Sequence, residues 1–520
     1  MRKAIGTCLL AGLWLGAAMA QEARIAIQTE TSSIDPHYAL VGANQMIARH
    51  FFDPLVGSDA DLHPVPGLTT FRQIAPDLWE FTIREGAAFH DGSKVTTEDI
   101  RFSLERMPKV PNSPAPFIRL ANALKSIEVV DSRTLRLRSR APDPVIPQHA
   151  MTAYIVSARA AASASTSDFN SGKATIGSGP WRFVEFVPGE RLVMARNDSY
   201  WGEKPAFARA TFRPIANDAA RLAALLANDV DLIAAVPPAE LPRLRGRQDL
   251  HISAHGSSRV VYLGLDQDND VSPFVTARDG SKLDRNPLKD VRVRQALNIA
   301  INREAIVERI MHGGALAAGQ LVPEGFIGYD PDLKPPAFDP ERARRLLAEA
   351  GYPDGFRITL HSPNNRYVED DKTAQAVVQM WSRIGLDARV DVMPSNVFFT
   401  RAGRREFSAF LIGFGSSAAD AYPGLSQVLH TYDRARGLGG LNRGRYSSPA
   451  FDAALAAARP LADPEARGAK LREAQRIGFA QDAGVLPLHF TMNIWATRAA
   501  LIYDGGIEEG TYAHNLHPAR

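Results

Sequence analysis

Two loops that each follow an apolar strand carry the side chains best suited to binding a small polar molecule. The first loop, Gly415–Pro423, leaves the apolar run 407–414 and contains Ser416, Ser417 and Asp420. Glycine and serine in this loop would expose backbone N–H groups and hydroxyls that can donate hydrogen bonds. Because ligands of open α/β sheets lie beyond the carboxyl ends of the strands, this loop is a candidate binding element.

The second loop follows the predicted strand Phe356–His361 and contains Asn364, Arg366 and Tyr367. The guanidinium of Arg366 offers a planar fork of donors that matches a carboxylate. An exposed arginine paired with Glu369 or Asp370 is the alternative, since such surface pairs are common and contribute little. The sequence leaves both interpretations open.

The sequence gives little support for catalysis. Neither G-x-S-x-G nor H-E-x-x-H occurs, and nothing in the sequence places a base beside Ser416 or Ser417. A secreted hydrolase is therefore the remote alternative to a binding protein, and no catalytic residue is assigned.

No metal or phosphate site is expected either. The acidic run 266–270 resembles the start of a calcium loop but lacks the turn glycine, so a solvated loop is expected. The glycine pair at 177 and 179 fits no phosphate-binding motif and predicts a tight turn. We expect no cofactor.

The first twenty residues have the pattern of a cleaved secretory leader. Arg2 and Lys3 precede an apolar run, and Ala18-Met-Ala20 fits the cleavage rule, which would start the mature chain at Gln21. A membrane anchor is the alternative, but the run falls short of the roughly 20 residues that a span needs. The only cysteine, Cys8, lies within this leader and not at a cleavage site, so neither a lipid anchor nor a disulfide is expected.

Length and charge restrict the class further. A chain of 520 residues predicts two or three domains. The 60 Lys and Arg nearly balance the 57 Asp and Glu, which argues against a nucleic-acid partner.

The elements that would position these loops can be read from periodicity. Alternation over 78–83 predicts a strand, and Thr96 with Asp99 predicts a capping box before a helix that stops at Pro108. A strand, a helix and a second strand over 356–392 predict a βαβ unit, and therefore a partly parallel sheet. Trp381, on the apolar stripe of that helix, is expected in the core.

Several segments, in order, resemble one family, the periplasmic peptide/nickel-type (family 5) solute-binding proteins of ABC transporters. The first three are LWEFTIREGAAFHDGSKVTTEDIRFSLERM, GSGPWRFVEFVPGERLVMARNDSYWG and LKDVRVRQALNIAINREAIVERI, and further matches cover 338–386 and 485–498. The resemblance thus extends over nearly all of the mature chain.

The resemblance implies an α/β fold of the two-lobed, type II-like periplasmic-binding-protein kind, with an extra domain inserted in the first lobe. Carried onto this chain, residues 1–20 form the signal peptide. Lobe I comprises 21–55, 176–265 and 489–520, the inserted domain 56–175, and lobe II 266–488. Closure of two hinged lobes on a ligand is the motion expected of such a fold.

The same resemblance assigns roles within the loops. Aligning Gly413–Phe414 with the family's Gly-Trp pair puts Ser417 where peptide-binding relatives hold the ligand ammonium with an aspartate. Asp420 falls on a second acidic position, and a turn or cap aspartate is the equally weighted alternative. Related proteins use an arginine near Arg366 for the peptide C-terminus, and contact ligand backbone near Thr31 and Ser32.

The function implied is that of the periplasmic substrate-binding component of an ABC importer, which is not an enzyme. It would bind a short peptide or peptide-like solute and deliver it to permease and ATPase subunits in the inner membrane, and we expect a monomer. A glutathione-like molecule, a nickel chelate, haem or an oligosaccharide are alternative solutes within the same class.

Overall fold

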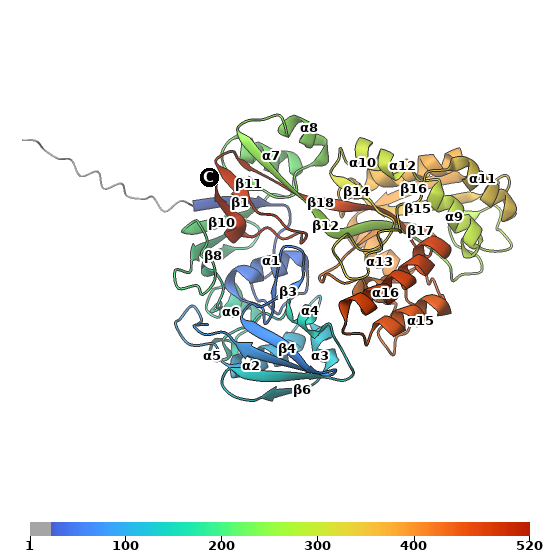
Figure 1. Cartoon of the computed structure of the whole chain (residues 1–520). Helices are drawn as coiled ribbons and strands as arrows, with labels where there is room; N and C mark the ends of the chain where they lie inside the picture. Colours follow the sequence, from blue (N-terminus) through green and yellow to red (C-terminus); the bar gives the residue numbers. More distant parts are fainter. Residues whose placement is uncertain (1–21, 520) are drawn as a thin grey trace, which may run out of the picture.

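The computed structural model describes residues 22–519 and consists of three bodies (Figure 1). Lobe I lies at the left, the inserted domain below it and lobe II at the right. Separate apolar cores underlie them: one of mainly 260–490 in lobe II, one of 55–155 in the insert, and two in lobe I. The leader predicted over 1–20 lies outside the described residues. The α/β, two-lobed fold class is confirmed.

One 12-stranded sheet runs through both lobes. Its central pair is β12 (Leu250–Leu265) and β18 (Leu486–Arg498), which are antiparallel and pass from one lobe into the other (Figure 1). The register of this pair shifts between Gly256 and Val260 and again between Val261 and Tyr262, and we take this irregular stretch as the expected hinge. The domain boundaries expected at 265 and 488 therefore fall at the end of β12 and within β18.

Lobe I is built on the sheet beyond β18, in the strand order β11, β1, β10, β9, β8. Its elements are β1 Glu22–Ile27, α1 Gly42–Phe51, β8 Trp181–Val187, β9 Arg191–Arg196, β10 Arg209–Pro214, α7 Asp218–Leu226, β11 Leu232–Ile233, η2 Pro238–Glu240, α8 Leu241–Leu244, β19 Leu501–Tyr503, η5 Ala513–Asn515 and β20 Leu516–Pro518. The hairpin of β2 Gly57–Ser58 and β3 Pro64–Val65, which the predicted boundaries place in the insert, forms a two-stranded sheet of its own, and Leu62 in its loop packs into the core of lobe II.

The inserted domain is a four-stranded sheet in the order β4, β5, β7, β6 with short helices beside it. Its elements are β4 Thr69–Ala75, β5 Leu78–Ile83, α2 Thr97–Arg106, η1 Met107–Lys109, α3 Ile118–Ala123, β6 Leu124–Val129, β7 Thr134–Ser139, α4 Ile146–Ala150, α5 Ala158–Ala161 and α6 Thr166–Asn170. The predicted capping box is present: the Asp99 carboxylate accepts the Thr96 N–H at 2.9 Å and its hydroxyl at 2.7 Å.

Lobe II contains the predicted βαβ unit. Strands β15 and β16 are parallel, the helix α12 joins them, and β17 is parallel to β15 on its other side. Trp381 is fully buried, as predicted, and donates to the Leu297 carbonyl at 3.0 Å. The elements are β13 Val275–Thr276, η3 Pro287–Lys289, α9 Val291–Ile299, α10 Arg303–Arg309, β14 Ala315–Ala317, α11 Pro340–Glu349, β15 Arg357–Pro363, α12 Asp370–Arg383, β16 Asp387–Met393, α13 Ser395–Gly403, β17 Ala409–Gly415, α14 Tyr422–Val428, α15 Pro449–Ala458, α16 Pro464–Gln475 and the π-helical turn η4 Arg476–Gln481.

Two buried arginines explain part of the third family segment. The Arg303 guanidinium donates to the Pro487 carbonyl at 2.7 Å, and Arg294 donates to the Asp482 carbonyl at 3.0 and 2.7 Å. Burial lowers the pKa of Arg303 to about 10. Both side chains join α9 and α10 to the backbone at and just before the start of β18. Arg294 and Arg303 of the third family segment therefore have structural roles.

The first two family segments meet at the seam between the insert and lobe I. His90 donates its backbone N–H to the Gly177 carbonyl at 2.7 Å, and its ring lies 3.0 Å from the Gly179 carbonyl oxygen. The two glycines pass directly against the end of α1, at Phe51. The turn around His90 is thus a structural contact and not part of a ligand site.

A buried acid lies at the same seam. Asp53 is 5% exposed and accepts hydrogen bonds from the Trp201 indole at 2.9 Å and the Tyr200 hydroxyl at 3.0 Å. Burial nevertheless raises the pKa of the Asp53 carboxyl to about 6. The charged form is therefore disfavoured in the folded protein.

This burial predicts a pH dependence of the free energy of unfolding. Because the folded pKa lies above the ordinary value of 3.8, the native state loses stability as pH rises from about 4 to 6, and the loss persists above that. The Asp53→Asn variant lacks this group, so from pH 4 to pH 7 it should gain on the order of 2 kcal/mol relative to the wild type. Urea unfolding at several pH values measures this difference. Parallel curves would show that Asp53 does not titrate in this range.

Candidate functional site

The two predicted loops lie side by side at the carboxyl ends of β15 and β17, which are neighbours in the sheet. The Tyr367 ring covers Gly413, where an added Cβ would come within 2.7 Å of it. Its hydroxyl donates weakly to the Gly413 carbonyl, at 3.4 Å. The expectation that both loops belong to one region of lobe II is therefore consistent with the fold.

The serines of the first loop differ in their surroundings. Ser416 is buried, donates its hydroxyl to the Ala418 carbonyl at 2.7 Å, and accepts Ser258 on its own carbonyl at 2.8 Å. Ser417 is exposed, and Phe414 is half-buried beside Gly424. Ser417 is thus available to a ligand, whereas the Ser416 hydroxyl already serves the turn.

Asp420 is not available to a ligand. It is 1% exposed; its Oδ2 lies 2.6 Å from Nε of Arg467, and its Oδ1 accepts the Tyr422 N–H at 2.7 Å. Arg467 is itself 3% exposed and donates to two further carbonyls. The ammonium-binding role considered for Asp420 has no support in this geometry, because the carboxylate is enclosed within lobe II as a turn and ion-pair residue.

Arg366 is exposed, and its guanidinium lies over the Tyr367 ring at 5.0 Å. The alternative of a surface ion pair is not observed: Asp370 accepts the backbone N–H of Arg366 at 3.0 Å, and Glu369 pairs with Lys372 at 2.7 Å. Asn364 is exposed in the same loop. The Arg366 side chain therefore has no carboxylate partner within residues 22–519.

The ligand contacts predicted at Thr31 and Ser32 belong to lobe I, where both side chains bond to near neighbours in the chain. The Thr31 hydroxyl is buried and donates to the Ser33 carbonyl at 3.1 Å, while the exposed Ser32 hydroxyl donates to Asn44 at 3.2 Å. Within the described part of the chain, residues 22–519, no hydrogen bond or ion pair joins these two residues to lobe II. Of the pair, Ser32 is the one that a ligand could reach.

An ion pair that the sequence does not predict lies where β12 passes from one lobe to the other. Arg259 of β12 and Glu509 of the C-terminal segment form a two-point ion pair, with Nη2 2.8 Å from Oε2 and Nε on Oε1. The neighbouring Glu508 pairs instead with Arg49 of α1 at 3.1 Å. Since Arg259 and Glu509 are 250 residues apart, no local pattern could have indicated the contact.

Electrostatics connect this pair to the predicted loop. Loss of water around Glu509 acts to raise the pKa of its carboxyl. The positive charges of Arg259 and, to a smaller extent, Arg366 together lower it by more, so this pKa lies below its ordinary value. The guanidinium of Arg259 also lies against Gly415, at 3.2 Å from the position of an added Cβ. Arg259 lies within β12 opposite Gly415, and Arg366 lies over the Tyr367 ring that covers Gly413 on the same strand. These contacts bring Arg259, Glu509 and Arg366 into one cluster beside the carboxyl ends of β15 and β17.

Beside this cluster, lobe II contacts the β2–β3 hairpin, which also contacts the C-terminal segment. Ala419 donates its N–H to the Leu62 carbonyl at 3.2 Å, and Leu62 belongs to the β2–β3 hairpin. The C-terminal segment joins in, because Ile507 donates to Ala60 at 2.8 Å and accepts Ser258 at 3.2 Å. We call this meeting point of the β2–β3 hairpin, β12, the C-terminal segment and lobe II the junction.

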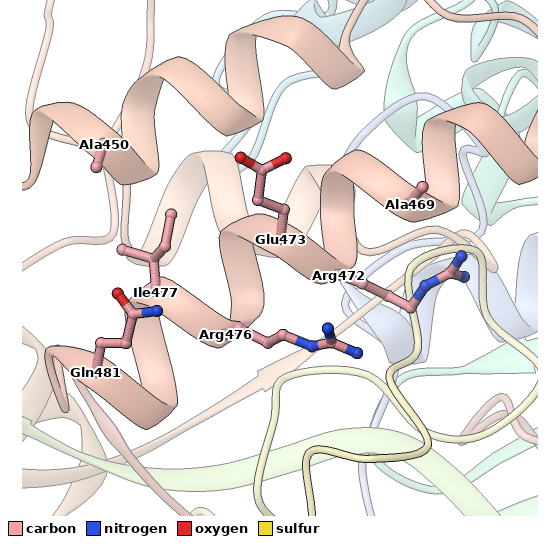
Figure 2. A pocket seen from close by; sticks show the side chains of 7 residues that line it. All are labelled: Ala450, Ala469, Arg472, Glu473, Arg476, Ile477 and Gln481. Atoms are coloured by element: carbon pink, nitrogen blue, oxygen red, sulfur yellow. The ribbon is translucent and has the colours of Figure 1, made fainter.

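A surface groove of about 490 Å³ lies elsewhere on lobe II, between α15 and the helix pair α16–η4 (Figure 2). Its long side chains are already engaged: Arg472 with Glu465, Glu473 with Lys470, and Arg476 with Asp330. None of the predicted binding residues lines this groove. We therefore place the candidate site at the junction.

Metal binding has no support in the described chain. The one H-x-x-x-H spacing, His251 and His255, lies on β12, where residues four apart are separated by about 13 Å. Across residues 22–519, no group of three or more His, Cys, Asp or Glu side chains is placed to hold a metal ion. Within the same range no helix is both long and apolar enough to cross a membrane.

Two lobes joined by crossing strands, with polar loops at the junction, define a two-lobed binding protein. The family model for "Bacterial extracellular solute-binding proteins, family 5 Middle" matches residues 63–436. The chain belongs to this family, and its function is that of a solute-binding protein.

Individual relatives are similar over most of the chain, and the solved structures among them share its fold. The glutathione-binding protein GsiB of Salmonella paratyphi A is 26% identical over 472 residues, which cover 89% of this chain and 87% of that protein. Among solved structures, HbpA2 from Haemophilus parasuis has a TM-score of 0.81 at 22% identity, covering 96% and 100%. The binding protein DppA from Helicobacter pylori, in complex with the peptide STSA, has a TM-score of 0.77 at 22% identity, covering 96% and 98%.

Proposed function

We propose that this protein is the periplasmic substrate-binding component of an ABC importer and takes a short peptide or a peptide-like solute such as glutathione. The observation that carries this proposal is the exposed Arg366 on the loop after β15, in a chain of this family. The leader pattern at the N-terminus supports export without a lipid anchor. The importer's permease and ATPase subunits are the expected partners of a monomer, and no catalytic step is assigned.

The proposed cycle uses the hinge in β12 and β18. A ligand bound between the lobes favours the closed state by its contacts with both of them, and docking on the permease favours reopening. On the lobe II side the ligand would meet Arg366, Asn364, Tyr367, Phe414 and Ser417. Ser32 is the lobe I contact of the proposal, while Thr31, Ser416 and Asp420 act in the framework.

Arg366 provides the direct test. A peptide at 100 times its Kd should raise the free energy of unfolding by roughly 2.7 kcal/mol, which a thermal shift detects. Arg366→Ala removes a charge-assisted contact with the ligand carboxylate, so the Kd should rise about 10-fold or more.

The control is Arg345→Ala, which removes an equally exposed arginine on α11 and should leave the shift unchanged. An unchanged Kd in Arg366→Ala would move the carboxylate site elsewhere. Mass spectrometry of the solute that co-purifies with the gently denatured protein tests the class itself, since a nickel chelate, haem or an oligosaccharide would replace the peptide proposal.

A further inference from the structure

The hinge cluster is unusual because its cations outnumber its acids. Arg259, Arg366 and Glu509 together carry one net positive charge, and Glu509 is shared between the fields of both arginines. Two other acids near the junction are paired with arginines, Glu508 with Arg49 and Asp420 with Arg467, while Asp59 and Asp61 of the hairpin lie beside His63 and His255. Around the Arg259 and Arg366 guanidinium groups themselves, the two positive charges against one acid favour an anion.

The ion pair of Arg259 is built so that its acid can leave. The Arg259 side chain is 18% exposed and fixed between β12 and Gly415, whereas the Glu509 side chain is 45% exposed. Since the Glu509 side chain reaches solvent, a ligand carboxylate can approach the same guanidinium. Gly415 has no side chain to crowd the guanidinium, whereas an added Cβ there would lie 3.2 Å from Nη2.

The position of Arg259 is also significant. It lies in the shifted register between Gly256 and Val260, where β12 passes from one lobe to the other. It is paired in the sheet with Gly415, the residue that opens the Ser416–Ser417 loop. A ligand held by Arg366 and Arg259 would therefore connect the loop after β15 to the hinge itself.

We infer that Arg259 is a second carboxylate-binding position beside Arg366, with Glu509 as its resident and displaceable counter-ion. The inference rests on the proposed function and narrows its substrate class to peptide-like solutes that carry two carboxylates. The ligand carboxylate replaces Glu509 on Arg259, and no enclosed acid is needed to hold a ligand ammonium. Glu509 thereby sets the affinity for anionic solutes by competing with them.

The test uses the full mature protein and isothermal titration with four probes: glutathione, its monoethyl ester, and the tripeptides Ala-Glu-Ala and Ala-Gln-Ala. The second carboxylate should strengthen binding at least 5-fold within a pair. Glu509→Gln removes the competitor, so binding of the dicarboxylates should tighten 3-fold or more while the monocarboxylates change less. Arg366→Gln should weaken the binding of every probe that binds the wild type. Arg345→Gln, which removes a positive charge far from the site, is the control for this variant.

The outcomes separate the inference from the proposed function. Two results would overturn the inference alone: equal Kd values for the probes with and without the second carboxylate, or a Glu509→Gln variant that binds the dicarboxylates no more tightly. The Arg259–Glu509 pair would then have a purely structural role. Failure of all four probes to bind would overturn the proposed function together with it. The Glu509 side chain is 45% exposed, and a urea curve verifies that each variant is folded.

Discussion

Asp420→Ala should destabilise the protein by about 3–5 kcal/mol while leaving peptide binding by the folded molecules within 3-fold of the wild type. The substitution strips the buried Arg467 of its only carboxylate partner within the described chain, at 2.6 Å. Two carbonyls still accept from Arg467, but they supply no negative charge. An uncompensated cation in the interior is the source of the cost. Urea unfolding measures it.

A paired replacement provides the control. Asp420→Leu combined with Arg467→Met removes both charges and fills similar space, so it should recover most of the loss. If instead Asp420→Ala costs less than about 1 kcal/mol and abolishes peptide binding, Asp420 is a ligand residue after all.

Gly177→Ala should cost about 3 kcal/mol or more. An added Cβ would lie 1.9 Å from the Phe51 carbonyl oxygen and 2.7 Å from the Phe52 ring. Neither neighbour can retreat, because both phenylalanines are fully buried and Phe51 ends α1. Relief of the clash would also pull Gly177 away from His90, which bonds to its carbonyl and its N–H. Urea unfolding of the purified variant gives the cost.

Gly42→Ala is the matched control, since it adds the same methyl group at the other end of the same helix. Nothing lies within 4 Å of that position. Its free energy of unfolding should stay equal to the wild type or rise by up to about 1 kcal/mol. Equal costs for the two variants would contradict the close contact at Gly177.

Sequence patterns predicted much of the framework because it depends on local rules. The capping box at Thr96 and the βαβ unit both depend on residues near each other in the chain. The turn at 177–179 was also expected, but for an incomplete reason. Neither glycine has a positive φ; glycine is needed because the end of α1 comes so close.

The candidate site was less predictable, for a physical reason. Asp420 carries the same local pattern whether it faces a ligand or an arginine 47 residues later, and only the packing of α16 distinguishes the two. Arg259 and Glu509 sit in unremarkable sequence and meet only because the C-terminal segment returns to the hinge. Arg366 is predicted from a local pattern, a loop that follows a recognisable strand, and its role in binding stays a prediction.

The placement of β18 has a consequence for how the chain acquires its structure. This strand comes from residues 486–498 yet lies in the middle of the sheet, between β12 and β11. Neither lobe can complete its sheet until the last tenth of the chain is available, so closure of long loops precedes the contacts that reward it. Synthesis from the N-terminus would thus leave an incomplete sheet that resists premature folding, a property suited to a polypeptide that crosses a membrane before it folds.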